Sequence, residues 1–294
     1  MLDEGGTRLK SYNKTPGLGL ALGSGGARGF AHIAVIEALF RHHLYPDVIT
    51  GSSMGAVIGA GIALHNDVEV VRRMTKHFVL QKQEMIETLI QSIEGKGGIA
   101  GQVELARRMT LSRSVVDDRF LYDTLSAIFG KARFSDAIIP LGVVVCDYQN
   151  GTTELIQCGF IVDAIAASAT IPGIFPPRIM GGSIMVDGGV TRCIPVPEAK
   201  EMGAQYVVGV DVGRLRPRES FHNAFDLVNY IDELKGEKIA EDDLVEASLV
   251  MSFEAVGHPW HRFDLFDEIL RDSRAHLKKS YEKELMRLSG MLST

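Results

Sequence analysis

The feature that most constrains the fold is a pair of strand–turn–helix units near the start of the chain. In the first unit, a buried apolar strand over residues 17–23 enters a glycine-rich turn and then a helix over residues 31–43. In the second, the extended run 47–50 leads into the sequence GSSMG at residues 51–55 and a small-residue helix over residues 56–64. Two such units in series predict an α/β fold with parallel strands and right-handed crossovers.

Further along the chain, helical and β-rich stretches continue this pattern, with no internal repeat and no clear domain linker. We predict helices at 67–94, 103–109, 119–129, 160–168 and 266–288, and strands at 140–146, 152–156, 183–186, 206–212 and 247–253. The simplest organisation is a flexible tail over residues 1–16 and a single domain over residues 17–294, mainly helical from about residue 214.

Composition narrows the class of protein. The net charge of −6 argues against a nucleic-acid partner, which usually requires a basic surface. Cys146, Cys158 and Cys193 lack disulfide or metal-site spacing and are interpreted as buried thiols in a reducing compartment. The first 16 residues do not resemble a secretory signal, and the uncharged run 48–64 is too short for a membrane span. We therefore expect a cytoplasmic protein, at most peripheral to the inner membrane face.

The sequence at residues 51–55 also matches G-x-S-x-G, the pattern of a nucleophile elbow. Small residues on both sides of Ser53 permit a sharp turn from strand to helix, which presents the hydroxyl to a substrate. So short a pattern also occurs by chance, and the strand before it and the helix after it are what favour a nucleophile.

A serine nucleophile requires a base that accepts its proton during attack. Histidine is the usual base, but none of the nine histidines lies in a setting that marks it for this role. Four that fall within or beside the first two predicted helices are interpreted as structural or surface residues: His32, His42, His43 and His65. His258 and His261, which flank Pro259-Trp260, remain a weaker alternative.

A carboxylate that reaches the serine directly can replace the histidine, and Asp187 is the best candidate. It ends a predicted strand, and Gly188-Gly189 behind it permits unusual backbone angles and close approach. We expect Asp187 to meet Ser53 because the carboxyl ends of parallel strands lie at one edge of a sheet, where such folds bind ligands. An ordinary Asp-Gly turn is the alternative interpretation.

The glycine-rich turn is a candidate oxyanion hole. Gly25, Gly26 and Ala27 lead into a helix N-terminus, where backbone N–H groups carry a positive partial charge. Together with the N–H of Met54 they could stabilise the negative oxygen of a tetrahedral intermediate. The alternative is a phosphate-binding loop for a nucleotide, but the acidic ribose partner expected after a second strand is missing.

Four motifs in this order resemble the patatin-like phospholipase family, and within it the compact bacterial subgroup. They are LGSGGARGFAHIAVIEAL at residues 22–39, GSSMG, Ala167-Ser168 followed by IPGIFPP, and DGG at residues 187–189. The resemblance covers about residues 17–212 and implies a three-layer α/β/α fold with a mainly parallel central sheet. It also implies a Ser53–Asp187 dyad without histidine, metal or cofactor.

The resemblance assigns Gly25, Gly26 and Ala27 to the oxyanion hole, with Arg28 beside them. Arg28 either holds the loop, adds positive charge or forms a plain salt bridge. Two residues depart from the family pattern. Ser24 stands where many relatives have a further glycine, and Cys193 stands where many carry an asparagine that supports the aspartate.

The expected activity is hydrolysis of a lipid or other acyl ester through an acyl-enzyme. The alternatives are a catalytically silent binding or regulatory module of the same fold, and an acyltransferase or thioesterase. The apolar segment 78–93 is either a lid over the site or a helix packed on the core. The head group, the acyl chain length and the oligomeric state stay open at this point.

Overall fold

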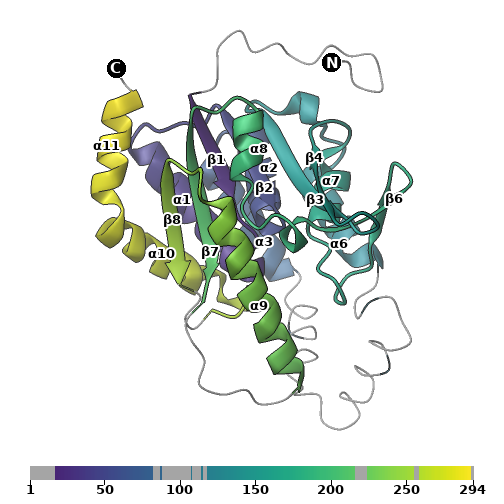
Figure 1. Ribbon diagram of the computed structural model, residues 1–294. Helices are drawn as coiled ribbons and strands as arrows, with labels where there is room; N and C mark the ends of the chain where they lie inside the picture. Colours follow the sequence, from purple (N-terminus) through teal and green to yellow (C-terminus); the bar gives the residue numbers. More distant parts are fainter. Residues whose placement is uncertain are drawn as a thin grey trace.

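The computed structural model describes residues 17–81, 118–215, 224–254 and 258–292, with the single residues 87, 107 and 114. In this part of the chain one sheet lies between two layers of helices, which confirms the predicted three-layer α/β/α fold (Figure 1). The predicted tail over residues 1–16, the helix at 103–109 and most of the segment 78–93 lie outside the described residues.

The strands form one mixed sheet. They are β1 (Leu18–Leu22), β2 (Val48–Ser52), β3 (Leu141–Asp147), β4 (Thr152–Ile156), β5 (Arg178–Met180), β6 (Ser183–Asp187), β7 (Tyr206–Arg214) and β8 (Leu249–Glu254). The order is β5-β6-β3-β2-β1-β7-β8, and β4 pairs with β3. The strands from β3 to β8 in this order run parallel, whereas β4 and β6 run antiparallel to β3, and β5 antiparallel to β6.

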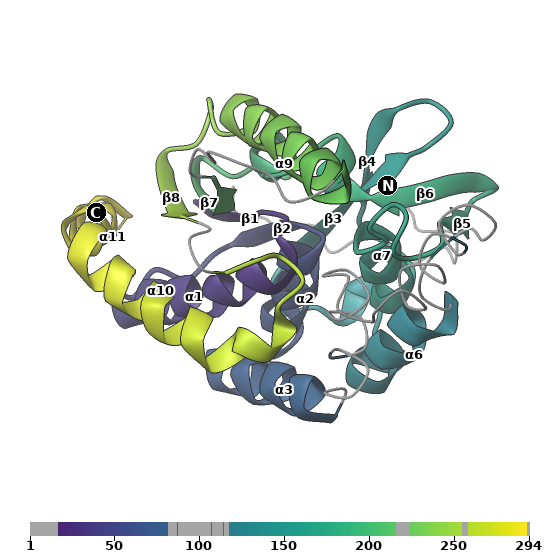
Figure 2. The ribbon, with the colours of Figure 1, turned by 90° about the horizontal axis from the view of Figure 1, so that it is seen from below.

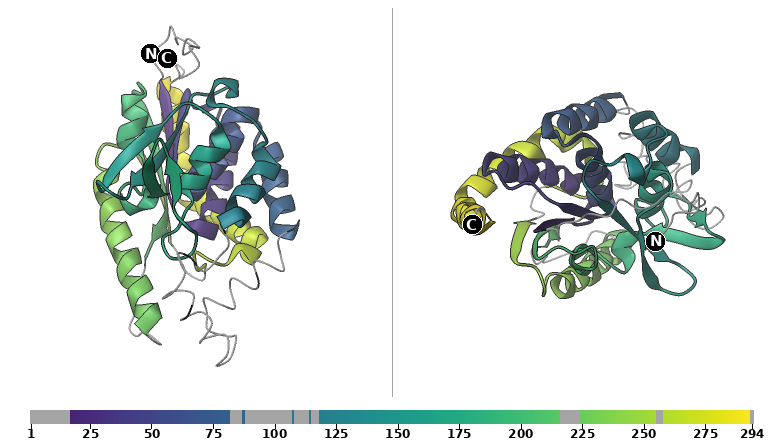
Figure 3. Two further views of the ribbon diagram at one scale, coloured as in Figure 1. Left: turned by 90° about the vertical axis from the view of Figure 1, so that its right-hand side faces the viewer. Right: turned by 90° about the horizontal axis from the view of Figure 1, so that it is seen from above.

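Helices cover both faces of the sheet. The described ones are η1 (Gly26–Phe30), α1 (Ala31–Arg41), α2 (Met54–His65), α3 (Val68–Gln81), α6 (Asp118–Phe129), η2 (Phe134–Asp136), α7 (Ile161–Ser168), η3 (Gly188–Val190), α8 (Val196–Glu201), α9 (Ala224–Asp243), η4 (Phe263–Leu265), α10 (Phe266–Ser280) and α11 (Glu282–Leu292). Helices α8 and α9 lie on one face, and α1, α2 and α7 lie on the other beneath α3, α6 and α10 (Figures 2 and 3). Within these ranges, no helix has both the length and the apolar character needed to cross a bilayer.

The strands near the middle of the sheet are buried on both faces, as parallel strands between helical layers require. Alternate residues of β1 point to opposite layers. Leu18, Leu20 and Leu22 pack into the larger core beside α1 and α2, whereas Ala21 joins a smaller core with Val207 beside α8. The site residues described below extend from this rigid framework.

The structure differs from the sequence-based prediction at three elements. The short strand β5 and the helix α8 were not predicted, because three to six residues give little periodicity to detect. The predicted helix 266–288 is two helices that break at Tyr281. The Tyr281 hydroxyl accepts a hydrogen bond from the Ser252 N–H at 2.9 Å, which ties the break to β8.

Candidate active site

Ser53 stands at a sharp turn between β2 and α2, as the elbow pattern predicts. Its backbone angles are φ 52° and ψ −121°, a strained conformation for a residue with a side chain. Small neighbours make this turn sterically feasible. A Cβ on Gly55 would overlap the carbonyl of Leu22, and a Cβ on Gly51 would overlap the backbone of Ala56.

The backbone of Ser53 is held by a residue for which no role was predicted, Ser168. The N–H of Ser53 donates to the hydroxyl oxygen of Ser168 at 2.9 Å, and Ser168 is completely buried at the end of α7. This bond satisfies a buried donor and keeps the strained turn in place. Ser168 falls within a motif that carries the family resemblance, but one sequence contains no signal for its specific contact.

The side chain of Ser53 meets Asp187 directly. Its hydroxyl donates to Asp187 Oδ2 at 2.7 Å, and both residues are buried. The other carboxylate oxygen accepts the N–H of Gly189 at 2.8 Å. The structure therefore brings together the two residues that the sequence selected, from positions 134 apart in the chain.

Strand β3 brings this pair together, but not in the way that the sequence argument assumed. Ser52 pairs with Val144 and Asp187 with the next residue, Val145, while β4 pairs along the opposite edge of β3. Strands β2 and β6 therefore share one edge of β3 and approach each other end to end. Asp187 ends an antiparallel strand, so the expected convergence of parallel strand ends is wrong as the reason for the contact.

Burial raises the pKa of Asp187 to about 6. Desolvation is the largest cause, and the negative charge of Asp232 on α9 acts in the same direction. The hydrogen bonds from Ser53 and Gly189 oppose it by stabilising the carboxylate. The side chain is therefore mostly ionised at neutral pH yet basic enough to accept a proton.

The two departures from the family pattern lie together beside Asp187. The Cys193 thiol donates to the carbonyl of Gly189 at 3.3 Å, and the Ser24 N–H donates to the carbonyl of Cys193 at 2.8 Å. Burial raises the pKa of Cys193 to about 12, so its sulfur keeps its proton and acts as a donor. Cys193 thus supports the residue whose N–H binds Asp187.

The predicted oxyanion donors differ in their hydrogen bonding. The N–H of Ala27 donates to the carbonyl of Trp260 at 2.7 Å, and the N–H of Arg28 to the carbonyl of Gly25 at 3.2 Å. Within the described ranges, the N–H groups of Gly25, Gly26 and Met54 have no hydrogen-bond acceptor. Among the described residues these three donors are thus unoccupied, whereas the N–H of Ala27 is occupied, and their part in an oxyanion hole stays a prediction.

The Arg28 side chain is engaged away from Asp187. Its Nε donates to the carbonyl of His258 at 2.8 Å, and its Nη2 forms an ion pair with Glu233 at 2.5 Å. Both side chains of this pair are largely buried, with exposed fractions of 8% and 15%. The salt bridge that was one alternative for Arg28 is therefore present, and together with the bond to His258 it ties the loop to the C-terminal part of the fold.

Of the candidate histidines, His32 supports the same turn. Its Nε2 lies 2.8 Å from the carbonyl of Gly23, and burial lowers the pKa of the imidazole to about 4. His32 is thus neutral at pH 7 and donates to that carbonyl. His258, the weaker alternative as a base, forms an ion pair with Asp272 at 3.3 Å.

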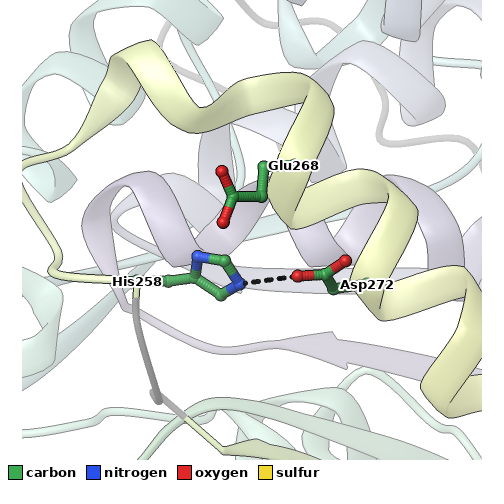
Figure 4. Close-up of side chains that lie close together, drawn as sticks. All are labelled: His258, Glu268 and Asp272. Atoms are coloured by element: carbon green, nitrogen blue, oxygen red, sulfur yellow. Dashed lines mark ion pairs between the residues drawn. The ribbon is translucent and has the colours of Figure 1, made fainter.

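His258, Glu268 and Asp272 could together hold a metal ion, because their donor atoms lie within 4.8 Å of one another (Figure 4). Both carboxylates are exposed, however, and Asp272 already faces the Nε2 of His258 in Figure 4. The ion pair between His258 and Asp272 accounts for the approach of these two side chains, and Ser53 and Asp187 are not members of this group.

A nucleophile elbow whose serine contacts a buried carboxylate, set in a three-layer α/β/α fold, is typical of a hydrolase that forms an acyl-enzyme. Comparison with known proteins identifies the family. The model of the patatin-like phospholipase family matches residues 20–200, more than half of the chain. The protein belongs to the patatin-like phospholipase family, a family of ester-bond hydrolases.

Individual relatives are distant and most are longer. The lysophospholipase NTE1 of Debaryomyces hansenii is 28% identical over 229 residues, which are 78% of this chain and 13% of that protein. An NTE family protein of Mycobacterium bovis is 30% identical over 201 residues, 68% of this chain and 50% of that protein. The structure of VipD from Legionella pneumophila aligns with 93% of this chain and 70% of its own at 14% identity and a TM-score of 0.41. The chain spans half or less of these two curated relatives.

Proposed function

We propose that this protein hydrolyses acyl esters of lipids, with Ser53 as nucleophile and Asp187 as its base. The observation that carries the proposal is the 2.7 Å hydrogen bond from the Ser53 hydroxyl to Asp187 at a strained elbow. Membership of the patatin-like phospholipase family supports a lipid substrate. The names of the relatives, lysophospholipase among them, favour a phospholipid or a lysophospholipid.

In the first half of the reaction, Asp187 accepts the Ser53 proton as the hydroxyl oxygen attacks the ester carbonyl. The carbonyl oxygen becomes an oxyanion, which the N–H groups of Gly25, Gly26 and Met54, unoccupied among the described residues, stabilise. The carbon–oxygen bond to the leaving alcohol then breaks, and Asp187 returns its proton to that alcohol. The fatty acyl group remains on Ser53 as an ester.

In the second half, water takes the place of the alcohol. Asp187 accepts a proton from the water as the water oxygen attacks the acyl ester, and the same N–H groups stabilise the second oxyanion. Collapse of this intermediate releases the fatty acid and returns the proton to Ser53. A pKa of about 6 suits Asp187 to both steps, because it must gain and lose a proton in each half.

The test is a hydrolysis panel of short p-nitrophenyl esters, long-chain phospholipids and lysophospholipids. We expect Ser53→Ala to reduce turnover to background and Asp187→Asn to reduce it by at least about 10³-fold, with both proteins folded. Ser52→Ala is the matched control, because the neighbouring hydroxyl is buried, has no hydrogen-bond partner in the described part of the chain, and its loss should leave most of the activity. Normal turnover in Asp187→Asn would move the base elsewhere.

The same panel separates the alternatives. If the wild type hydrolyses nothing and a fluorophosphonate probe does not label Ser53, the chain is a silent binding module. If an added alcohol or thiol captures the acyl group faster than water does, the chain is a transferase.

The proposed substrate also implies peripheral contact with a membrane surface from the cytoplasmic side. Leu80, near the end of α3, is 59% exposed and could take part in such contact. We expect the wild type to co-sediment with phosphatidylcholine vesicles and Leu80→Glu to do so less. Equal recovery of both proteins in the supernatant would exclude this contact.

A further inference from the structure

The glycine-rich turn is held by residues far outside the family match. Trp260 contributes the carbonyl that accepts from Ala27, and His258 the carbonyl that accepts from Arg28. Glu233, on α9, supplies the carboxylate that pairs with Arg28. All three lie beyond residue 200, where the match to the family model ends.

The contact between the turn and Trp260 is a close one. Gly26 has φ 56°, and a Cβ at this position would overlap the Trp260 carbonyl oxygen. The segment of residues 258–262 therefore lies directly on the turn, and the glycine permits both the backbone angle and the approach. A shift of this segment moves the hydrogen bond of Ala27 with it.

The segment is fixed on its far side by α10. Asp272 forms the ion pair with His258 that Figure 4 shows. The rings of Phe263 and Phe266, which follow the segment, pack against Phe30 at the end of η1, with centroid distances of 5.9 and 4.9 Å. Helix α10 and the segment thus form a brace that contacts the glycine-rich turn through Trp260 and the end of η1 through Phe30.

We propose that Glu233 and the 258–262 segment are positioning elements of the reaction: they hold the glycine-rich turn so that its Gly25 and Gly26 N–H groups stay directed at the oxyanion. The inference rests on the proposed function. Removing the charge of Glu233 leaves the largely buried Arg28 guanidinium without the carboxylate that it pairs with, which favours a shift of Arg28 toward water. Arg28 is part of η1, and its movement displaces the donors beside it.

The decisive variant is Glu233→Gln, assayed with an aryl ester and the matching thionoester. Sulfur is a weak hydrogen-bond acceptor, so the ratio of the two kcat/KM values reports on the oxyanion donors. We expect the ester kcat to fall about 10–100-fold with KM within about 2-fold, and the ester-to-thionoester ratio to fall with kcat. A general loss of folded protein would lower the rates with both substrates equally and leave the ratio unchanged.

Glu241→Gln is the matched control. Glu241 lies on the same helix and pairs with Lys238 at an exposed site, so its exchange should change neither kcat nor the ratio.

Asp272→Asn tests the brace at its other end. Asp272 and His258 line a cavity of about 370 Å³, so the exchange meets no packing barrier. We expect the ester kcat of Asp272→Asn to fall by about 3–10-fold, and the ester-to-thionoester ratio to fall with it. Its control is Asp267→Asn, which breaks a surface pair with Lys76.

Amide hydrogen exchange over residues 22–30 separates this inference from the proposed function, because it requires no turnover. We expect faster exchange in Glu233→Gln than in Glu241→Gln. If the wild type is inactive and this difference is present, the proposed function fails and the holding of the turn stands. If the wild type is active and the two variants share one ratio and one exchange rate, the inference is overturned and the dyad stands.

Discussion

Two turns flank the proposed reaction centre, and they keep their shapes by different means. The elbow at residues 51–55 is shaped mainly by its own glycines and by backbone within a few residues or on the neighbouring strand, with one long-range bond from the Ser53 N–H to Ser168. The glycine-rich turn at residues 23–29 depends on Glu233 and His258, which contact Arg28 from 205 and 230 positions away. A short motif can therefore specify the proposed nucleophile, whereas the proposed oxyanion site depends on contacts made by the tertiary fold.

The largest effect should come from disturbing the elbow sterically. In Gly55→Ala the new Cβ meets the Leu22 carbonyl, and backbone of a central strand cannot move aside. We expect a loss of at least about 3 kcal/mol in the free energy of unfolding, together with loss of activity. Urea denaturation measures the first quantity. A stable and active Gly55→Ala protein would show that the elbow is not shaped as described.

Gly26→Ala applies the same change to the other turn. Its Cβ would overlap the Trp260 carbonyl, and the positive φ of this position is unfavourable for alanine. The opposing segment, however, is a loop rather than a strand. We expect a smaller cost in stability, about 1–3 kcal/mol, and an activity loss of about 100-fold. If Gly26→Ala destabilises the protein as much as Gly55→Ala, the contrast between the turns fails.

Ser168→Ala tests the long-range contact of the elbow backbone. The exchange leaves the Ser53 N–H buried without an acceptor, which costs about 1–3 kcal/mol. We expect this loss in thermal or urea unfolding, with kcat reduced about 10-fold because the strained serine relaxes. Equal stability of Ser168→Ala and the wild type would show that the elbow keeps its shape without the bond to Ser168.

The buried charge of Asp187, next to the elbow, lowers the stability of the folded protein. Its folded pKa of about 6 exceeds the value near 3.9 of an unfolded chain, so between these pH values the folded state binds more protons. Stability from this group is therefore present below about pH 4 and lost as the pH rises through 6. We expect Asp187→Asn to be more stable than the wild type by about 1–3 kcal/mol at pH 7–8. The gap should close near pH 4, and a constant gap would point to packing instead.

The smallest effect concerns the pH profile. Because Asp187 must be ionised to accept the serine proton, kcat/KM should rise with pH through about 6 and then level off. Asp232 raises the pKa of Asp187, so Asp232→Asn should move the midpoint to lower pH. An unmoved midpoint would mean that the charge of Asp232 on α9 does not affect the pKa of Asp187.

What the sequence could reveal follows the same division. The elbow was predictable because the small residues next to Ser53 permit its sharp turn. Asp187 was predictable because two glycines follow it. Its route to the serine was not predictable, since an antiparallel return strand has the same local pattern as a parallel one. Trp260 and His258 act through backbone carbonyls, which any residue carries, so no residue type marks them. Glu233 is one acidic residue among many on an exposed helix.

The central claim is that Ser53 carries the acyl group during turnover. The most direct measurement is mass spectrometry of protein quenched during hydrolysis of a long-chain ester, with the chain digested after acid denaturation. The account predicts the added mass of one fatty acyl group on the peptide that contains Ser53, and no such mass in Ser53→Ala. Steady turnover with an unmodified Ser53 peptide, or an acyl group on another residue, would contradict it.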